Sequence, residues 1–241
     1  MGLGDVTAAE LDKLRTLPSV TVTILGTILT GALLTAVVVV AGVDRQAQLT
    51  GLDALLAVVP FVQVGFILLG ALPTAQEYAG HQLRTSLTAV PHRGHLVVSK
   101  TAVSASVVAL TASVTVAAGV ATAPITYLLL GEPQPASGVD LLALIGAAGY
   151  LTLIGLFAHA VALLLRHLLP SFVTVLSIVL VISPVLAGLT GHARWLPDRA
   201  AAQLYDLTDP VITAATGPLV TLAWIVLIGT AGTIQFIRRD A

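Results

Sequence analysis

Long apolar runs alternate with short polar stretches along most of the chain. A bilayer core of roughly 30 Å is crossed by about 20 apolar residues of α-helix, so each run of that length is a candidate span. The pattern predicts an all-α polytopic membrane protein, with one transmembrane domain over residues 1–241. Its six expected spans are Val20 to Val43, Leu52 to Ala75, Val97 to about Ala121, Leu141 to Leu165, Leu168 to Leu189 and Pro218 to Ile237.

The same runs exclude a membrane β-barrel and a cleaved signal peptide. They are about twice the length of an outer-membrane strand, and they do not alternate polar with apolar residues. The first run begins at Val20, is longer than the apolar region of a signal peptide and has no evident cleavage site. We therefore expect the first span to be retained.

Prolines lie within two of the expected spans. Pro60 and Pro73 predict a kinked second span, because a proline leaves a helical carbonyl without its usual donor. The third run continues without a charge to Leu130, but Pro124 lies near its end. We expect the third helix to stop near Pro124.

A short amphipathic helix is expected at residues 5–17, ahead of the first span. Thr7 and Glu10 have the spacing of a capping box, in which each side chain satisfies a free amide at a helix start. Two leucines share one face, charged residues lie around the other, and Pro18 ends the segment. This pattern favours a helix that lies along the inner leaflet, with a frayed soluble tail as the alternative.

Basic residues set the expected orientation. An even number of spans places both termini on one side, and cytosolic loops are enriched in Lys and Arg. We therefore expect both termini in the cytosol and the chain in a plasma membrane. The abundance of Ala, Val, Leu and Gly with little Lys is typical of a GC-rich bacterial genome. The terminal side carries Lys13, Arg15, Arg84, Arg93, Lys100, Arg166, Arg238 and Arg239, and the opposite side carries Arg45, Arg194 and Arg199.

Composition narrows the function. Charged residues make up only 10% of the chain and mean hydropathy is +0.98. The chain has no cysteine, which excludes thiolate metal sites and cysteine nucleophiles, and its net charge of -1 offers no basic surface for nucleic acid. His92 and His95 have no cysteine or acidic neighbour to complete a metal site. We expect no catalytic, cofactor or metal site in this chain.

Few polar side chains fall inside the expected spans. The candidates to line a transport pathway are Gln63 in the second span, a stripe of Ser104, Thr111 and Thr115 in the third, and His159 in the fourth. For each of them we favour hydrogen bonding or close packing between helices, with contact to a cargo as the alternative. The spans hold no carboxylate of the kind that proton-driven carriers use as relays, which disfavours such a carrier.

The expected outer loop, residues 191–217, is longer than the other outer connections. It contains Trp195, Pro197 and the helix-prone stretch Ala200 to Tyr205. Trp and Tyr suit the headgroup region, where an apolar ring and a polar edge are both accommodated. We expect short helices tucked into the outer leaflet, which serve either as a structural cap or as a gate.

The segment 77–96 is the longest polar interruption of the apolar pattern. Leu83, Leu87 and Val90 have i, i+4 and i+7 spacing, and Pro91 disfavours helix at the residue before it. The predicted helix is too short to be stable alone in water, so its apolar stripe needs a surface. We favour a groove on a cytosolic partner, with the inner leaflet and loop packing as alternatives.

Several residues occur here in a characteristic order. Glu77 and Gly80 precede the helix Gln82 to Val90, and Pro91, Arg93 and Lys100 follow it. With the six spans, the amino-terminal helix and the long outer loop, this order resembles the type 2 ATP-binding-cassette (ABC) exporter permeases, which have the type V exporter fold. This chain departs from them at His81, where relatives often have a threonine after the glycine.

The resemblance implies a permease subunit that homodimerises and is driven by separate cytosolic ATPase subunits, which would bind ATP and Mg²⁺. The chain itself has no G-x-x-x-x-G-K-[ST] phosphate loop. ATP would close the ATPase pair and shift the permease between states through the docked helices. The residues implied in coupling are Glu77, Leu83, Arg84, Leu87, Val90 and Arg93.

Few charges along the spans favour a hydrophobic or amphipathic cargo, such as a drug, peptide or lipid, over an ion. Two other functions fit the same pattern. One is a membrane adaptor that transports nothing and recruits a cytosolic partner through the segment 77–96. The other is an independent secondary carrier.

Overall fold

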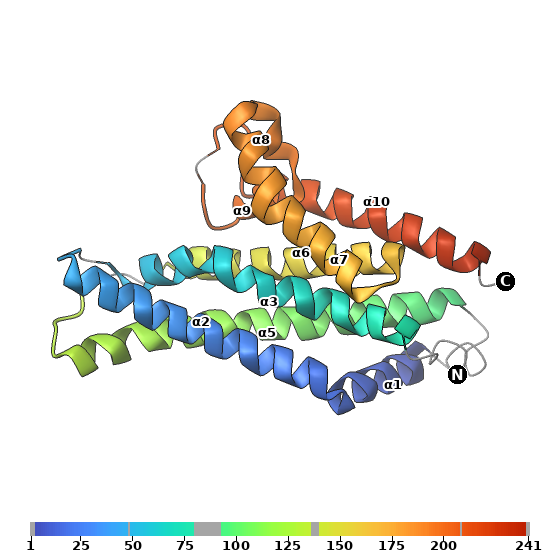
Figure 1. The fold of residues 1–241 in the computed structure, drawn as a ribbon, viewed down its shortest axis with the longest axis horizontal. Coiled ribbons are helices and arrows are strands. Elements are labelled where there is room, and N and C mark those ends of the chain that lie inside the picture. The colour runs from blue at the N-terminus through green and yellow to red at the C-terminus, as the bar shows by residue number, and fades with distance from the viewer. Residues whose placement is uncertain (1–2, 48, 80–92, 136–139, 208, 240–241) are drawn as a thin grey trace.

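The fold is a helix bundle in the computed structural model, which describes residues 3–47, 49–79, 93–135, 140–207 and 209–239. Within these residues, six helices are long and apolar enough to cross a membrane, as predicted. The chain is therefore a multi-pass helical membrane protein. The amino-terminal helix and the end of the last helix lie at the same end of the bundle (Figure 1). We call this the inner end and the opposite one the outer end.

The six spans follow a short first helix, and the fifth span consists of three consecutive elements. In chain order, the described elements are α1 (Leu3–Thr16), α2 (Pro18–Asp44), α3 (Gly51–Ala79), α5 (Arg93–Leu130), α6 (Leu141–Leu165), α7 (Leu168–Ser177), the π-helix η1 (Ile178–Ile182), α8 (Ser183–Leu189), the 3₁₀ helix η2 (Gly191–Trp195), α9 (Pro197–Ala202) and α10 (Thr216–Arg239).

The helix α1 begins four residues before the predicted capping box. Thr7 is inside α1, and its hydroxyl donates to the carbonyl of Gly4 over 3.1 Å instead of capping a helix start. The capping-box prediction is therefore wrong, because the amides that it would satisfy already belong to a continuous helix. Pro18 separates α1 from α2 as expected, since Leu17 before it is extended and Pro18 opens the next helix.

The core of the bundle lies where α3 packs against α6. Gly70 of α3 meets the backbone of Gly155 so closely that a Cβ on Gly70 would lie 1.9 Å from the Gly155 carbonyl oxygen. Small residues allow helices in a membrane to approach in this way. Phe66 and Phe157 are fully buried beside this contact. The helices α2 and α5 pack against α3, and α5 also packs against α6.

The third span continues past Pro124 to Leu130, so the prediction that it stops near Pro124 is wrong. A proline removes only its own N–H from the helical ladder, and the carbonyl that it leaves lies near the outer end. Beyond the proline, Tyr127 anchors the last turn, because its hydroxyl donates to the Leu49 carbonyl over 2.7 Å. This contact stabilises the extra helical turns.

The fifth span changes helix type halfway along. The residues Ile178–Ile182 form a π-helix directly before Pro184, which has no N–H to donate to the preceding turn. The helix α7 packs against α3 and α6, and η1 and α8 continue from it away from these two helices (Figure 1). After them, η2 and α9 are the short helices expected in the outer loop, and α9 packs against α6 and α10.

Candidate functional site

Two groups of polar contacts, an ion pair and a histidine with two threonines, meet on α5 and join four helices near the inner end. They consist of Glu10 on α1, Thr74 on α3, Lys100 and Thr101 on α5, and His159 on α6, and we call them together the inner junction. All but Thr101 are less than a tenth exposed. Because buried polar groups are costly without partners, this arrangement holds the four helices in one register.

The ion pair in the inner junction ties α1 to α5. The Lys100 ammonium lies 3.7 Å from Oε2 of Glu10, and Lys13 lies 3.8 Å from the other oxygen of the same carboxylate. Glu10 therefore bridges a lysine on its own helix and a lysine on the third span. The carboxylate fastens the interfacial helix to the bundle.

His159 ties α6 to its two neighbours. Its Nδ1 lies 3.1 Å from the Thr74 hydroxyl and its Nε2 lies 3.3 Å from the Thr101 hydroxyl. Both ring nitrogens therefore have a partner inside the bundle. A hydroxyl can donate or accept, so a neutral imidazole satisfies both contacts in either tautomer.

The inner junction lies close to the ends of the segment 80–92. Thr74 precedes the end of α3 at Ala79 by about 8 Å of helix, and Lys100 follows the start of α5 at Arg93 by about 11 Å. In addition, the Gln76 amide donates to the Ser19 hydroxyl at the start of α2 over 2.8 Å. A displacement of this segment would therefore act on α1, α2, α3, α5 and α6 together.

The residues predicted to dock a partner are not all within the described part. Leu83, Arg84, Leu87 and Val90 lie outside the described residues. Glu77 belongs to the last turn of α3 and Arg93 is the first residue of α5, but their side chains are also outside the described part. The docking of these residues on a cytosolic partner stays a prediction.

Among the candidate pathway residues, Gln63 is enclosed between α3 and α6. Its side-chain oxygen accepts from the hydroxyl of Tyr150, and its amide nitrogen donates to the Pro60 carbonyl over 2.7 Å. The whole residue is 3% exposed. These contacts join two helices of one chain, and contact with a cargo stays a prediction. The same holds for His159.

The candidate pathway residues of the third span lie on α5, where Thr115 faces α2. The hydroxyls of Thr111 and Thr115 donate to the backbone of their own helix over 2.8 and 2.7 Å, as Thr side chains in membrane helices do. The Thr115 methyl lies where a Cβ on Gly31 of α2 would approach it to 3.0 Å. Ser104 is buried as well. Thr115 therefore packs α5 against α2, and a pathway role for the three residues stays a prediction.

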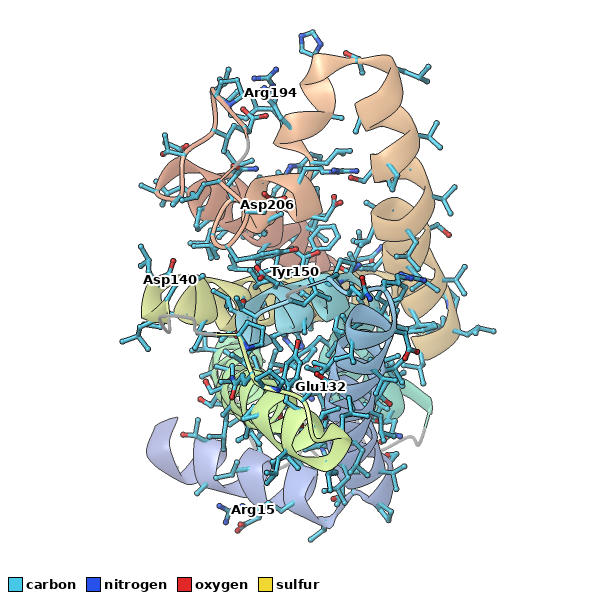
Figure 2. The ribbon with its side chains drawn as sticks, turned by 90° about the vertical axis from the view of Figure 1, so that its left-hand side faces the viewer. Arg15, Glu132, Asp140, Tyr150, Arg194 and Asp206 are labelled. Carbon is cyan, nitrogen blue, oxygen red and sulfur yellow. The ribbon has the colours of Figure 1, made fainter. Side chains whose placement is uncertain are left out.

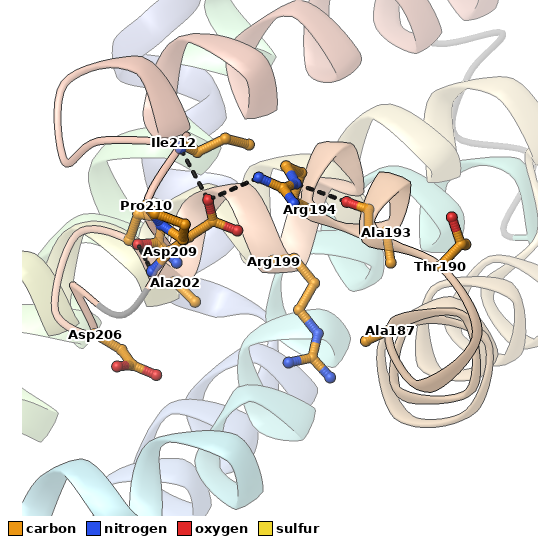
Figure 3. A pocket seen from close by; sticks show the side chains of 12 residues that line it. Ala187, Thr190, Ala193, Arg194, Arg199, Ala202, Asp206, Asp209, Pro210 and Ile212 are labelled. Carbon is orange, nitrogen blue, oxygen red and sulfur yellow. Dashed lines mark hydrogen bonds and ion pairs between the residues drawn. The ribbon is translucent and has the colours of Figure 1, made fainter.

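At the outer end, a polar cavity of about 240 Å³ lies between α8, η2 and α9 (Figure 3). Arg194 points toward Asp209 in its wall, with Nη1 3.3 Å from the carboxylate. The amides of Ile212 and Val211 donate to the same carboxylate and lower the pKa of Asp209. Arg199 turns away from this pair and donates to the Ser183 hydroxyl over 3.2 Å. These contacts fasten the outer loop to α8 and η2.

Two further titratable groups lie on α9 and directly after it. Burial raises the pKa of Asp198 on α9, and smaller opposing effects come from Ser183 and Arg199. Burial, together with the charge of Asp206, raises the pKa of Tyr205 to about 12. The Tyr205 ring also packs edge-on against Tyr150, with ring centroids 5.2 Å apart. The outer loop is thus built into the bundle.

No group of three or more His, Asp or Glu side chains in the described part of the chain is placed to hold a metal ion. No protein-family model and no curated protein matches the chain.

Sequence reasoning missed most of the inner junction. Lys100 was singled out for its place in the order of residues, but its partner Glu10 was assigned to a helix cap. No local pattern points to Thr74 or Thr101, although a histidine inside an apolar span signals that hydroxyl or amide partners face it. The missing information was which helices are neighbours.

Proposed function

We propose that this protein is the membrane subunit of an ABC exporter, in which two copies form the pathway and each binds a cytosolic ATPase through the segment 77–96. The inner end faces the cytosol, as the excess of Lys and Arg on that side favours. The membrane is the bacterial plasma membrane. The cargo is a hydrophobic or amphipathic compound.

The observation that carries the proposal is the position of the inner junction. A transporter driven by a separate ATPase needs a mechanical connection between the docking segment and the spans. Here the segment between α3 and α5 is flanked by helix ends that polar contacts fasten to α1, α2 and α6. A membrane adaptor would need only the docking segment.

In this mechanism, ATP binding draws the two ATPase subunits together and moves the docked segments with them. Because α3 and α5 are joined to their neighbours, the spans of one copy move largely as a rigid unit. Nucleotide then favours one arrangement of the two copies over the other, as a population shift requires. The cytosolic ATPase supplies the Mg²⁺ and ATP chemistry.

Purification together with the ATPase encoded beside the gene tests the proposal. The wild type should carry an ATPase whose hydrolysis is blocked by vanadate, and Leu83→Asp/Leu87→Asp should lose it, because two buried charges oppose docking. The matched control is Leu207→Asp/Val211→Asp, two exposed outer-loop residues that should leave the ATPase bound. If no ATPase co-purifies, or if the docking variant retains a fully active one, the proposal is wrong.

A further inference from the structure

We propose that the groove between α1, α2 and α5 is a binding site for one anionic phospholipid of the inner-end leaflet. One acyl chain would occupy the groove and the phosphate would lie beside Arg15. The proposal depends on the membrane fold and not on an ATPase partner.

The groove is a cavity of about 360 Å³ with an almost entirely apolar wall. Its two threonines do not make it polar, because the Thr111 hydroxyl donates to the Val107 carbonyl of α5 and the Thr21 hydroxyl donates to the Leu17 carbonyl just before α2. The wall is completed by residues of three helices, with Leu14 from α1, Ile24 from α2 and Leu110 from α5 among them. Such a wall suits a hydrocarbon chain.

The groove has the depth of one leaflet. Its α2 wall extends from Val20 to Ile28, which is about 12 Å along a helix axis. Half of a hydrocarbon core that is about 30 Å thick is roughly 15 Å. The groove therefore reaches from the inner surface, marked by the break between α1 and α2 at Leu17, almost to the bilayer centre.

Among the described residues that line the groove, Arg15 alone is charged, and it lies in the last turn of α1 at the surface end of the groove. Figure 2 shows Arg15 at the edge of the molecule, away from the core. Glu10, the nearby bridging carboxylate, is within ion-pair distance of Lys13 and Lys100. Among the described residues, no carboxylate lies within ion-pair distance of Arg15.

An apolar groove with one cation at its surface end suits an amphiphile that has one anionic headgroup. A guanidinium binds phosphate oxygens in a bidentate manner, and its aliphatic part can extend along apolar surface to reach them. A zwitterionic headgroup has the same phosphate, but its own cation competes for it. An anionic phospholipid should therefore be preferred.

Native mass spectrometry of the delipidated protein in mild detergent tests the site, with phosphatidylglycerol and phosphatidylcholine as probes. The wild type should retain one phosphatidylglycerol in preference to phosphatidylcholine. Arg15→Gln should reduce that preference roughly fivefold, the contribution of one basic residue near anionic lipid. Arg15→Lys should restore most of it. Leu110→Trp should fill the groove and reduce binding of both lipids.

A matched control separates groove filling from surface change. Leu33 of α2 is 66% exposed and Leu110 is 68% exposed, but Leu33 does not line the groove. Leu33→Trp should therefore leave lipid binding unchanged. The proposal is overturned if Arg15→Gln keeps the wild-type preference, or if Leu110→Trp binds lipid as Leu33→Trp does. Conversion of a dimer to a monomer by Leu110→Trp, without loss of bound lipid, would assign the groove to a second copy and also overturn it.

Discussion

Breaking the link between α1 and α5 should weaken the inner end of the bundle by a measurable amount. The perturbation is a double-mutant cycle of Glu10→Gln, Lys100→Gln and both together. These substitutions remove charge and retain most of the side-chain volume. Each single variant leaves a charged or polar group facing a neutral amide at a nearly buried position.

The distance and burial of the pair set the expected magnitude. Two unit charges 3.7 Å apart attract by about 4 kcal/mol at an effective dielectric constant near 20. Desolvation of both groups offsets part of this gain. When Lys100 is replaced, the Lys13 ammonium still lies 3.8 Å from the Glu10 carboxylate and partly offsets its charge. We therefore expect a coupling energy of about 2 kcal/mol, well above the roughly 0.3 kcal/mol of an exposed helical pair.

Unfolding of the purified chain by a denaturing detergent measures the four free energies. The control is Asp12→Asn, which removes an exposed carboxylate from the same helix and should change stability little. In the proposed complex with an ATPase, the Glu10→Gln variant should also reduce ATP hydrolysis, because α1 would no longer move with α5. A coupling energy indistinguishable from zero would refute the assignment of this pair as a fastening between the two helices.

Three further predictions concern the core and the outer end. The Gly70→Ala variant should fail to fold or lose about 3 kcal/mol or more, because its Cβ overlaps the Gly155 carbonyl. By contrast, Gly26→Ala meets nothing within 4 Å and should be tolerated, as yield and thermal unfolding in detergent would show. Tyr150→Phe should cost about 0.6 to 1.7 kcal/mol, the range for hydrogen bonds between membrane helices, in the same unfolding assay. Burial raises the pKa of Asp198 above 3.8, so folded-state stability should fall as pH rises from 3.8 through that raised pKa. An unchanged pH profile in Asp198→Asn would contradict this origin.

The six spans were predictable because the bilayer imposes a length on every helix that crosses it. The first span was expected at Val20 to Val43, and α2 begins at Pro18 and ends at Asp44. Hydrophobicity and length alone give such bounds. They do not decide how far a helix continues beyond the apolar core, which is why the turns after Pro124 were missed.

The inner junction was not predictable for a different reason. Thr74 and His159 are 85 positions apart, and only the packing of α3 against α6 brings them together. Glu10 has the local spacing of a capping residue, but a tertiary contact with Lys100 outweighs that pattern. Local sequence patterns identify which polar residues need partners. Which partners they find depends on the arrangement of the helices.

If ATP at the proposed partner subunit moves the inner junction, a distance between the two copies of the chain should change. The chain has no cysteine, so Val98→Cys introduces a single thiol near the start of α5, at a residue that is 56% exposed. Spin labels on the two copies then report one distance across the dimer by pulsed electron paramagnetic resonance. We predict that ATP with vanadate changes this distance in the complex and that Leu83→Asp/Leu87→Asp abolishes the change. An unchanged distance in a complex that hydrolyses ATP would contradict this movement of the inner junction.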